Sequence, residues 1–192
     1  IEHISNHVAN SRWSDVPESP QDILAHARMR AKLLAFLEPL ERTLKEYPES
    51  DTSLPARYAR AIAYYRKANL ARALPLIDGL IMERPDDPYF YELRGQMLFE
   101  NGHLAKAVHS FKVAVDLKPD SALLLTLLAQ AQLELNDPAL TKNATTNLVE
   151  AVNLERDNAS SWNFLAIAYG RQGRIGLSSL ALAEKFLITG EN

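Results

Sequence analysis

The sequence predicts an all-α protein, a right-handed superhelical solenoid made of helix-turn-helix hairpins. Three observations predict this class. A motif of seven residues recurs at nearly constant intervals. A small residue precedes each copy of the motif at a fixed distance. Asn-Gly or Gln-Gly pairs stand at the predicted turns of two hairpins. A hairpin of two helices cannot bury its apolar face alone, so neighbouring hairpins are expected to stack into a superhelix.

The recurring seven-residue motif marks the end of the second helix in each predicted hairpin. Its copies are Leu80–Asp86, Ala114–Asp120 and Ala151–Asp157. The interval from Pro119 to Arg156 is three residues longer than the interval from Pro85 to Pro119. Small residues keep the same rhythm at Ala73, Ala107, Ala144 and Ser178. Proline ends a helix because it lacks an N–H and clashes with the preceding turn. The copies of the motif therefore predict the boundaries of the hairpins.

This pattern resembles the tetratricopeptide repeat family, whose period of about 34 residues matches the interval between the two prolines. The family places an aromatic residue, an apolar-small pair and a second aromatic residue on the first helix of each hairpin. The hairpin with the best match carries Trp162, Leu165, Ala166, Tyr169 and Gly173. The one that starts at Pro88 carries Tyr91, Gly95, Leu98, Gly102, Ala107, Phe111, Ala114 and Pro119. The resemblance covers residues 54 to about 188 and implies a solenoid that binds other polypeptides.

The repeats also predict how the chain is organised. We expect a linker or tail at residues 1–19, a degenerate N-terminal capping hairpin at 20–53, single repeats at 54–87 and 88–121, a repeat with a short insertion at 122–158, and a last repeat with a C-terminal cap at 159–192. The capping hairpin is expected to break near Glu38-Pro39. The three extra residues of the fourth hairpin are expected around Asp137-Pro138, at a turn where insertions are tolerated. Gly95, Ala129 and Ala166 are small, so paired helices can approach closely there.

The composition excludes several classes of function. The net charge is −3 and the isoelectric point is about 6.0, so we expect no nucleic-acid partner. The chain has no cysteine, which excludes disulfides and thiolate zinc sites. No apolar run approaches the ~20 residues of a membrane span, so we expect no transmembrane segment. The chain begins at Ile1 and not at Met, which indicates a piece of a longer protein.

No constellation of residues indicates catalysis. A Gly-rich phosphate loop, a nucleophile elbow and a dinucleotide fingerprint are all missing. His3 and His7 have a spacing that suits two ligands of one metal, but Ile4 stands where zinc proteases have Glu. We interpret them as surface histidines of a linker. Asp86 and Asp87 are expected to cap a helix. We therefore predict no enzyme activity, catalytic residue, metal or cofactor for this chain.

A partner polypeptide is expected in the concave groove, which in this family is lined by the first helix of each hairpin. Aromatic rings supply apolar area, and side-chain amides bond to a peptide backbone. The predicted groove residues are Tyr58, Ile62, Tyr65, Tyr89, Glu92, Gln96, Phe99, Gln130, Asn163 and Arg171. Chaperone adaptors of the family hold a carboxylate with a clamp of two Lys and two Asn, which this chain lacks. A peptide with basic residues suits Glu92, Glu100 and Glu134 better.

Three stretches resemble a narrower group of proteins: Asp15–Pro20, Met29–Leu37 and Pro55–Ala61. They are similar to the region that follows the catalytic domain in bacterial periplasmic zinc metalloproteases, the group that contains the β-barrel assembly-enhancing protease. Residues 1–8 look like the tail of the linking segment, although the usual Pro after His3 is missing and His7 replaces the common Arg. The catalytic His-Glu-x-x-His of the group is absent from this chain, so no catalytic or zinc residue is carried over.

The narrower resemblance implies a periplasmic module that recruits polypeptides to a zinc metalloendopeptidase. Its partners would be substrate proteins, outer-membrane assembly components or its own protease domain. The alternative is a free-standing scaffold or adaptor in envelope assembly or secretion. The two hypotheses differ in what precedes Ile1, which is either a protease domain with the zinc motif or nothing.

Overall fold

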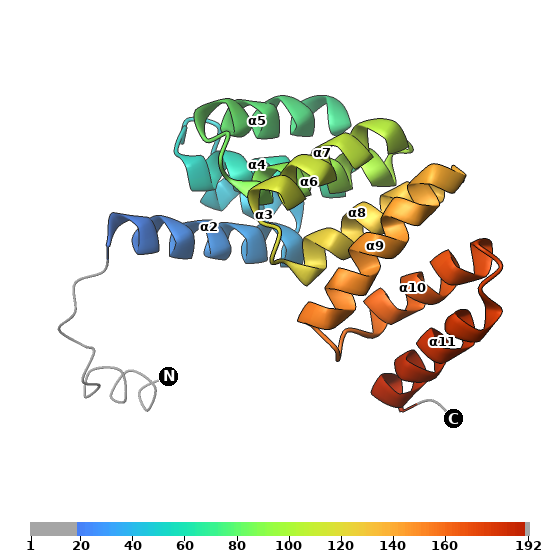
Figure 1. The fold of residues 1–192 in the computed structure, drawn as a ribbon. Coiled ribbons are helices and arrows are strands. Elements are labelled where there is room, and N and C mark those ends of the chain that lie inside the picture. Colours follow the sequence, from blue (N-terminus) through green and yellow to red (C-terminus); the bar gives the residue numbers. More distant parts are fainter. Residues whose placement is uncertain (1–18, 191–192) are drawn as a thin grey trace, which may run out of the picture. The chain divides into compact units, whose positions relative to one another are not determined.

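The computed structural model describes residues 19–190, which form ten helices and no strand (Figure 1). The helices are α2 (Pro20–Leu37), α3 (Leu40–Glu46), α4 (Leu54–Arg66), α5 (Leu70–Glu83), α6 (Pro88–Glu100), α7 (Leu104–Leu117), α8 (Ala122–Glu134), α9 (Pro138–Leu154), α10 (Ala159–Arg171) and α11 (Ile175–Thr189). The predicted all-α class of helix-turn-helix hairpins is confirmed. The described residues divide into two compact units, 19–68 and 69–190.

The first unit is built on the packing of α2 against α4. Helix α2 starts at Ser19, whose hydroxyl accepts from the Asp22 backbone N–H at 3.1 Å while the Asp22 carboxylate accepts from the Ser19 N–H. This reciprocal arrangement satisfies two backbone donors at the helix start. The small residues Ala31 and Ala35 of α2 are fully buried. The helix ends before Pro39, and the predicted break near Glu38-Pro39 is confirmed.

Two arginines of α4 hold the preceding helices in place. Arg60 is 5% exposed and donates to the carbonyl oxygens of Tyr47, Pro48 and Asp51 at 3.3, 2.6 and 2.8 Å. Arg66 donates to the carbonyl oxygens of Ala35 and Glu38 at 2.8 and 2.7 Å, at the C-terminus of α2. A cation there satisfies free carbonyls and complements the helix dipole.

In the second unit the hairpins α6–α7, α8–α9 and α10–α11 follow α5 in order (Figure 1). Each turn within a hairpin has three residues, and Gly102 and Gly173 adopt the left-handed φ values of 77° and 72° that favour glycine. Gly95 is the predicted point of close approach, because Phe111 of α7 packs directly against it. Asp87 caps α6 by accepting from the Tyr89 backbone N–H at 3.0 Å, as expected for this carboxylate.

The three extra residues of the fourth hairpin lengthen a helix and not a turn. Helix α9 has 17 residues where α7 has 14, and the turn before it has the same length as the other turns. Pro138 stands at the start of α9, and the Asp137 carboxylate accepts from the backbone N–H groups of Ala139 and Leu140 at 2.7 and 3.1 Å. A cap followed by proline starts α9 directly after a turn of the usual length, so the three extra residues lie within the helix.

Polar contacts connect successive helices of the second unit. The Arg94 guanidinium of α6 donates to Asp78 of α5 at 2.7 Å and to the Ser110 hydroxyl of α7 at 2.8 Å. The hydroxyls of Thr126 on α8 and Ser161 on α10 are 2.8 Å apart, and both residues are buried. Buried polar atoms are costly without a partner, so these contacts fix which faces of the helices meet.

Candidate functional site

The predicted groove residues of α4 are buried. Tyr58, Ile62 and Tyr65 of α4 are 1%, 0% and 7% exposed. Every residue from Tyr58 to Tyr65 is buried, so α4 is covered on all sides. Helical spacing correctly places Tyr58, Ile62 and Tyr65 on one side of the helix, but it does not tell which side other helices cover. These three side chains present almost no surface to a partner.

The predicted groove residues of the second unit are more accessible. Tyr89, Gln96 and Phe99 of α6, Gln130 of α8 and Asn163 of α10 are half-buried, and Arg171 at the end of α10 is exposed. Glu92 differs, since it is only 6% exposed. Phe99 also packs against the core cluster that contains Leu98 and Phe111. The accessible members come from three helices, each the first of its hairpin.

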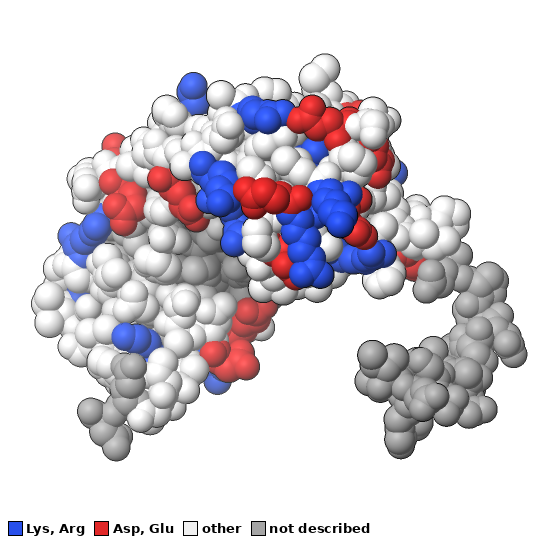
Figure 2. All heavy atoms as spheres, turned by 180° about the vertical axis from the view of Figure 1, so that it is seen from behind, with Lys and Arg blue, Asp and Glu red and all other residues white. Residues whose placement is uncertain are grey.

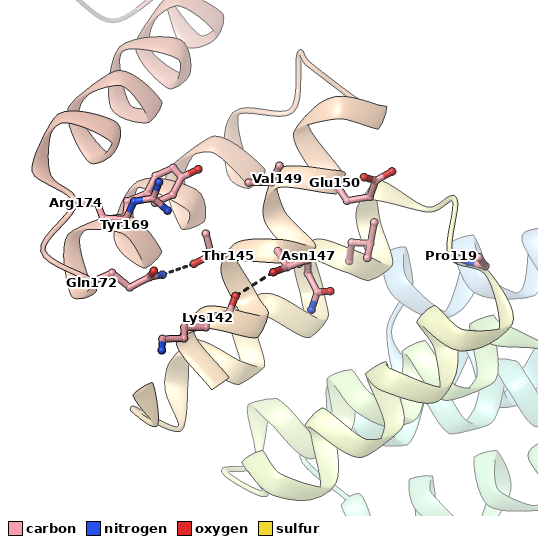
Figure 3. Close-up of a pocket in the computed structure, with 11 residues that line it drawn as sticks. Pro119, Lys142, Thr145, Asn147, Val149, Glu150, Tyr169, Gln172 and Arg174 are labelled. Carbon is pink, nitrogen blue, oxygen red and sulfur yellow. Dashed lines mark hydrogen bonds between the residues drawn. The ribbon is translucent and has the colours of Figure 1, made fainter. Parts of the chain in front are cut away.

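A separate hollow of about 730 Å³ lies along α9 and the turn between α10 and α11 (Figure 3). Its lining consists of Pro119, Leu125, Lys142, Thr145, Thr146, Asn147, Val149, Glu150, Tyr169, Gln172 and Arg174. An adjoining hollow of about 540 Å³ shares Lys142, Gln172 and Arg174 with it. The second hollow adds Asn136, Pro138, Thr141 and Arg171. Together they form a depression that the sequence does not predict.

Side-chain contacts hold the walls of this depression in place. The Gln172 amide donates to the Thr145 hydroxyl (Figure 3), which in turn donates to the Thr141 carbonyl at 2.9 Å. The Arg174 guanidinium lies over the Tyr169 ring, 4.8 Å from its centre. Because these groups already have partners, they position the wall and leave little freedom for rearrangement.

The two hollows differ in one charged residue each. Lys142 and Arg174 line both hollows, and the smaller one adds Arg171 whereas the larger one adds Glu150. Arg171 also donates to the Leu133 carbonyl at the C-terminus of α8. The sequence signal at this position is the run of Thr and Asn residues on α9, which are Thr141, Asn143, Thr145, Thr146 and Asn147.

The described residues hold no cluster of three or more His, Cys, Asp or Glu that would suit a metal ion. His3 and His7, which have the spacing of metal ligands, lie outside the described residues. Within residues 19–190, no helix combines the length and the apolar character needed to cross a bilayer.

Comparison with known proteins identifies the architecture. Residues 58–122, about a third of the chain, match the family model of the tetratricopeptide repeat. Solved structures of MamA superimpose on most of the chain at low sequence identity. The fold is that of a tetratricopeptide solenoid. MamA residues 41 to the end from Desulfovibrio magneticus RS-1 give a TM-score of 0.71 at 15% identity, covering 88% of this chain and 96% of that one.

Two further MamA structures agree with this result. A double mutant of MamA from RS-1 gives a TM-score of 0.69 at 16% identity, with coverage of 86% and 93%. MamA from MSR-1 gives 0.68 at 15% identity, with coverage of 86% and 94%. No curated protein matches the chain by sequence. In tetratricopeptide terms, α6, α8 and α10 are first helices, and α5, α7, α9 and α11 are second helices.

Proposed function

We propose that this chain is a protein-binding module, and that the first helices α6, α8 and α10 carry its binding surface. The supporting observation is the set of accessible amide, aromatic and charged side chains that these three helices share. The set contains Tyr89, Gln96, Phe99, Gln130, Asn163 and Arg171, all half-buried or exposed. Rings contribute apolar area and amides bond to a peptide backbone, which suits an extended polypeptide.

The partner segment is proposed to carry basic residues. Glu100 and Glu134 stand at the ends of α6 and α8, and both are exposed. Glu92 contributes less than expected, since its side chain is almost fully buried. Arg171 lies at the corresponding end of α10, so we expect the basic residues of the partner to lie toward α6 and α8.

We further propose that the parent protein is a periplasmic zinc metalloendopeptidase that uses these repeats for recruitment. This proposal is supported by the three sequence stretches alone. Asp15–Pro20 lies almost wholly outside the described residues. The other two stretches lie on α2 and α4, where Ala31, Ala35 and Arg60 hold α2 and the following loop against α4. The alternative is a free-standing scaffold or adaptor, in which α2 would have to pack against α4 in the same way.

A pull-down from a bacterial envelope extract, read by mass spectrometry, tests these proposals. The chain is compared with the variant Glu100→Lys/Glu134→Lys and with the control Glu150→Lys. Glu150 is exposed like the other two but lies on the second helix α9. Because an exposed ion pair contributes up to about 1 kcal/mol, we expect about three- to tenfold weaker binding by the double variant alone.

The identity of the captured proteins separates the two parent hypotheses. Outer-membrane assembly components or a zinc protease domain would support recruitment to a protease. A different envelope complex, captured without a protease, would support the free-standing scaffold. Equal capture by the double variant would place the binding surface elsewhere, and loss of capture with Glu150→Lys would place it at the hollow along α9.

A further inference from the structure

Three cations line the smaller hollow along α9, and none of them is paired with a carboxylate of the described residues. They are Lys142 of α9, Arg171 at the end of α10 and Arg174 directly before α11, and all three are exposed. The Arg171 guanidinium donates to the Leu133 carbonyl oxygen, and the Arg174 guanidinium lies over the Tyr169 ring. Neither contact cancels a charge, so the three cations leave the hollow positively charged.

Other cations of the chain lie beside carboxylates. On the face shown in Figure 2, blue and red atoms alternate over much of the charged surface. Among the described residues, Arg30 pairs with Glu46 and Lys112 pairs with Asp116, each at 2.8 Å. Such exposed pairs contribute little to stability, but each leaves no net charge. The smaller hollow differs from these places, because three cations gather in it without a carboxylate in its lining.

The two acidic residues that belong to α9 and its cap leave this charge in place. The Asp137 carboxylate accepts from the backbone N–H groups of Ala139 and Leu140 at 2.7 and 3.1 Å, and Asp137 lines neither hollow. Glu150 lines the larger hollow alone, and it lies about 12 Å beyond Lys142 along the helix axis. The first turn of α11 contains no acidic residue. The smaller hollow therefore suits a negatively charged ligand.

The size of the depression suits several residues of an extended chain. The smaller hollow has about 540 Å³ and the larger one about 730 Å³. A water molecule occupies about 30 Å³, so a single small anion would leave most of this space unfilled. Side-chain amides line the depression beside the cations, and Figure 3 shows Gln172 between Arg174 and Lys142. Amides bond to a peptide backbone, so the lining combines groups for a polypeptide with cations for its acidic side chains.

We propose that the depression binds an acidic segment of a polypeptide. The carboxylates of the segment contact Lys142, Arg171 and Arg174, and its backbone follows Gln172 and Asn147 into the larger hollow. A guanidinium binds a carboxylate through two parallel hydrogen bonds, which favours carboxylates at the two arginines. The cations are exposed, so salt should weaken this binding.

This site goes beyond the proposed function, because the first helices are expected to bind a segment with basic residues. Lys142 and Arg174 belong to α9 and to the turn between α10 and α11. Arg171 belongs to both surfaces, so the test changes Lys142 and Arg174 and leaves Arg171 in place. Glu100 and Glu134 also stay unchanged. The two proposals can therefore fail independently.

Fluorescence anisotropy with a synthetic acidic peptide tests the site. The probe is fluorescein-labelled Gly-Glu-Glu-Ala-Glu-Glu-Gly, titrated at low salt with the chain from roughly 1 µM to 1 mM. The variant Lys142→Gln/Arg174→Gln should bind the probe about five- to thirtyfold more weakly, since each exposed charge pair is worth up to about fivefold. The control Arg84→Gln/Lys106→Gln removes the same charge from exposed positions elsewhere, and it should bind like the unchanged chain. Equal loss with both variants, or no binding of the probe, would overturn the proposal.

A neutral peptide and inorganic phosphate separate this ligand from others. The same peptide with Gln in place of Glu should bind at least about tenfold more weakly. Inorganic phosphate should displace the probe only at a concentration about a hundredfold higher than unlabelled acidic peptide requires. Equal binding of the neutral peptide would contradict recognition by charge. Displacement by phosphate at the same concentration as the peptide would assign the hollow to a free anion instead.

Chemical-shift mapping locates the probe without any substitution. The acidic peptide, added to the isotope-labelled chain, should shift the backbone amides of residues 136–147 and 169–174, which contain the three cations. Shifts concentrated in residues 88–100 and 122–134 would place the peptide on the first helices and overturn the proposal.

Discussion

Gly95 of α6 lies against the ring of Phe111 of α7, and a Cβ at position 95 would come within 2.6 Å of two ring carbons. Phe111 is 2% exposed and belongs to a core cluster with Leu98, so neighbouring side chains surround its ring. Overpacking of a core costs about 1–3 kcal/mol, which exceeds the gain of up to ~1 kcal/mol in helix propensity for Ala over Gly. Gly95→Ala should therefore lower the free energy of unfolding, as measured by urea denaturation.

Gly79 of α5 is the matched control for this substitution. A Cβ at Gly79 would have no neighbour within 4 Å. Gly79→Ala should therefore stabilise the protein by up to ~1 kcal/mol through helix propensity alone. If both substitutions stabilised the chain, the close approach of α6 and α7 would not be a constraint on the fold.

Ala68 holds the left-handed turn position that glycine occupies in other hairpins. Its φ is 55°, against 77° for Gly102, which stands at the same position one repeat later. Asn136 occupies the next such position with a φ of 54°. A left-handed conformation costs a residue with a Cβ about 1–2 kcal/mol, so Ala68→Gly should raise the melting temperature. The opposite change, Gly102→Ala, should lower it, and equal melting temperatures would contradict the assignment.

The buried hydroxyls of Thr126 and Ser161 connect α8 and α10, and Ser161 is 0% exposed. Thr126→Val removes the partner of Ser161 and should cost about 1–3 kcal/mol. The double variant Thr126→Val/Ser161→Ala removes both groups and should be less destabilised than the sum of the single variants. A double-mutant cycle by denaturant unfolding measures this coupling, and strictly additive effects would mean that the bond contributes nothing.

The buried guanidinium of Arg60 organises the loop between α3 and α4 through three carbonyl oxygens. Lysine has one ammonium on a flexible stem and cannot reproduce this planar arrangement. Arg60→Lys should therefore make residues 47–53 more sensitive to limited proteolysis, with a loss of stability of roughly 2 kcal/mol. Arg84→Lys, at an exposed position, serves as the control. Unchanged cleavage in Arg60→Lys would show that the loop is held by other contacts.

The repeat spacing predicts the fold well because each hairpin obeys the same local rules. Gly102 and Gly173 adopt the predicted turns, Asp87 caps α6, and Gly95 is the predicted close approach. The equivalent turn residues Ala68 and Asn136 are not glycine, so the sequence pattern does not mark them as left-handed positions. The extra residues of the fourth hairpin were expected in a turn, but Asp137 and Pro138 begin α9 immediately after it.

The candidate site was less predictable, because helical phase does not reveal which faces are covered. The helical spacing of Tyr58 and Ile62 suits the groove, but both side chains are buried. The hollow along α9 combines α9, the α10–α11 turn and Pro119, which come together only in the folded chain. Arg60 would likewise be expected at the surface from the sequence alone, because its carbonyl partners belong to the loop before the helix and meet it only in the folded chain.

Hydrogen exchange of the chain, free and bound to its captured partner, tests the central claim most directly. If the partner binds to the first helices, the backbone amides of residues 88–100, 122–134 and 159–171 should exchange more slowly in the complex. Protection confined to residues 138–154 and 172–174 would contradict it and assign binding to the hollow along α9.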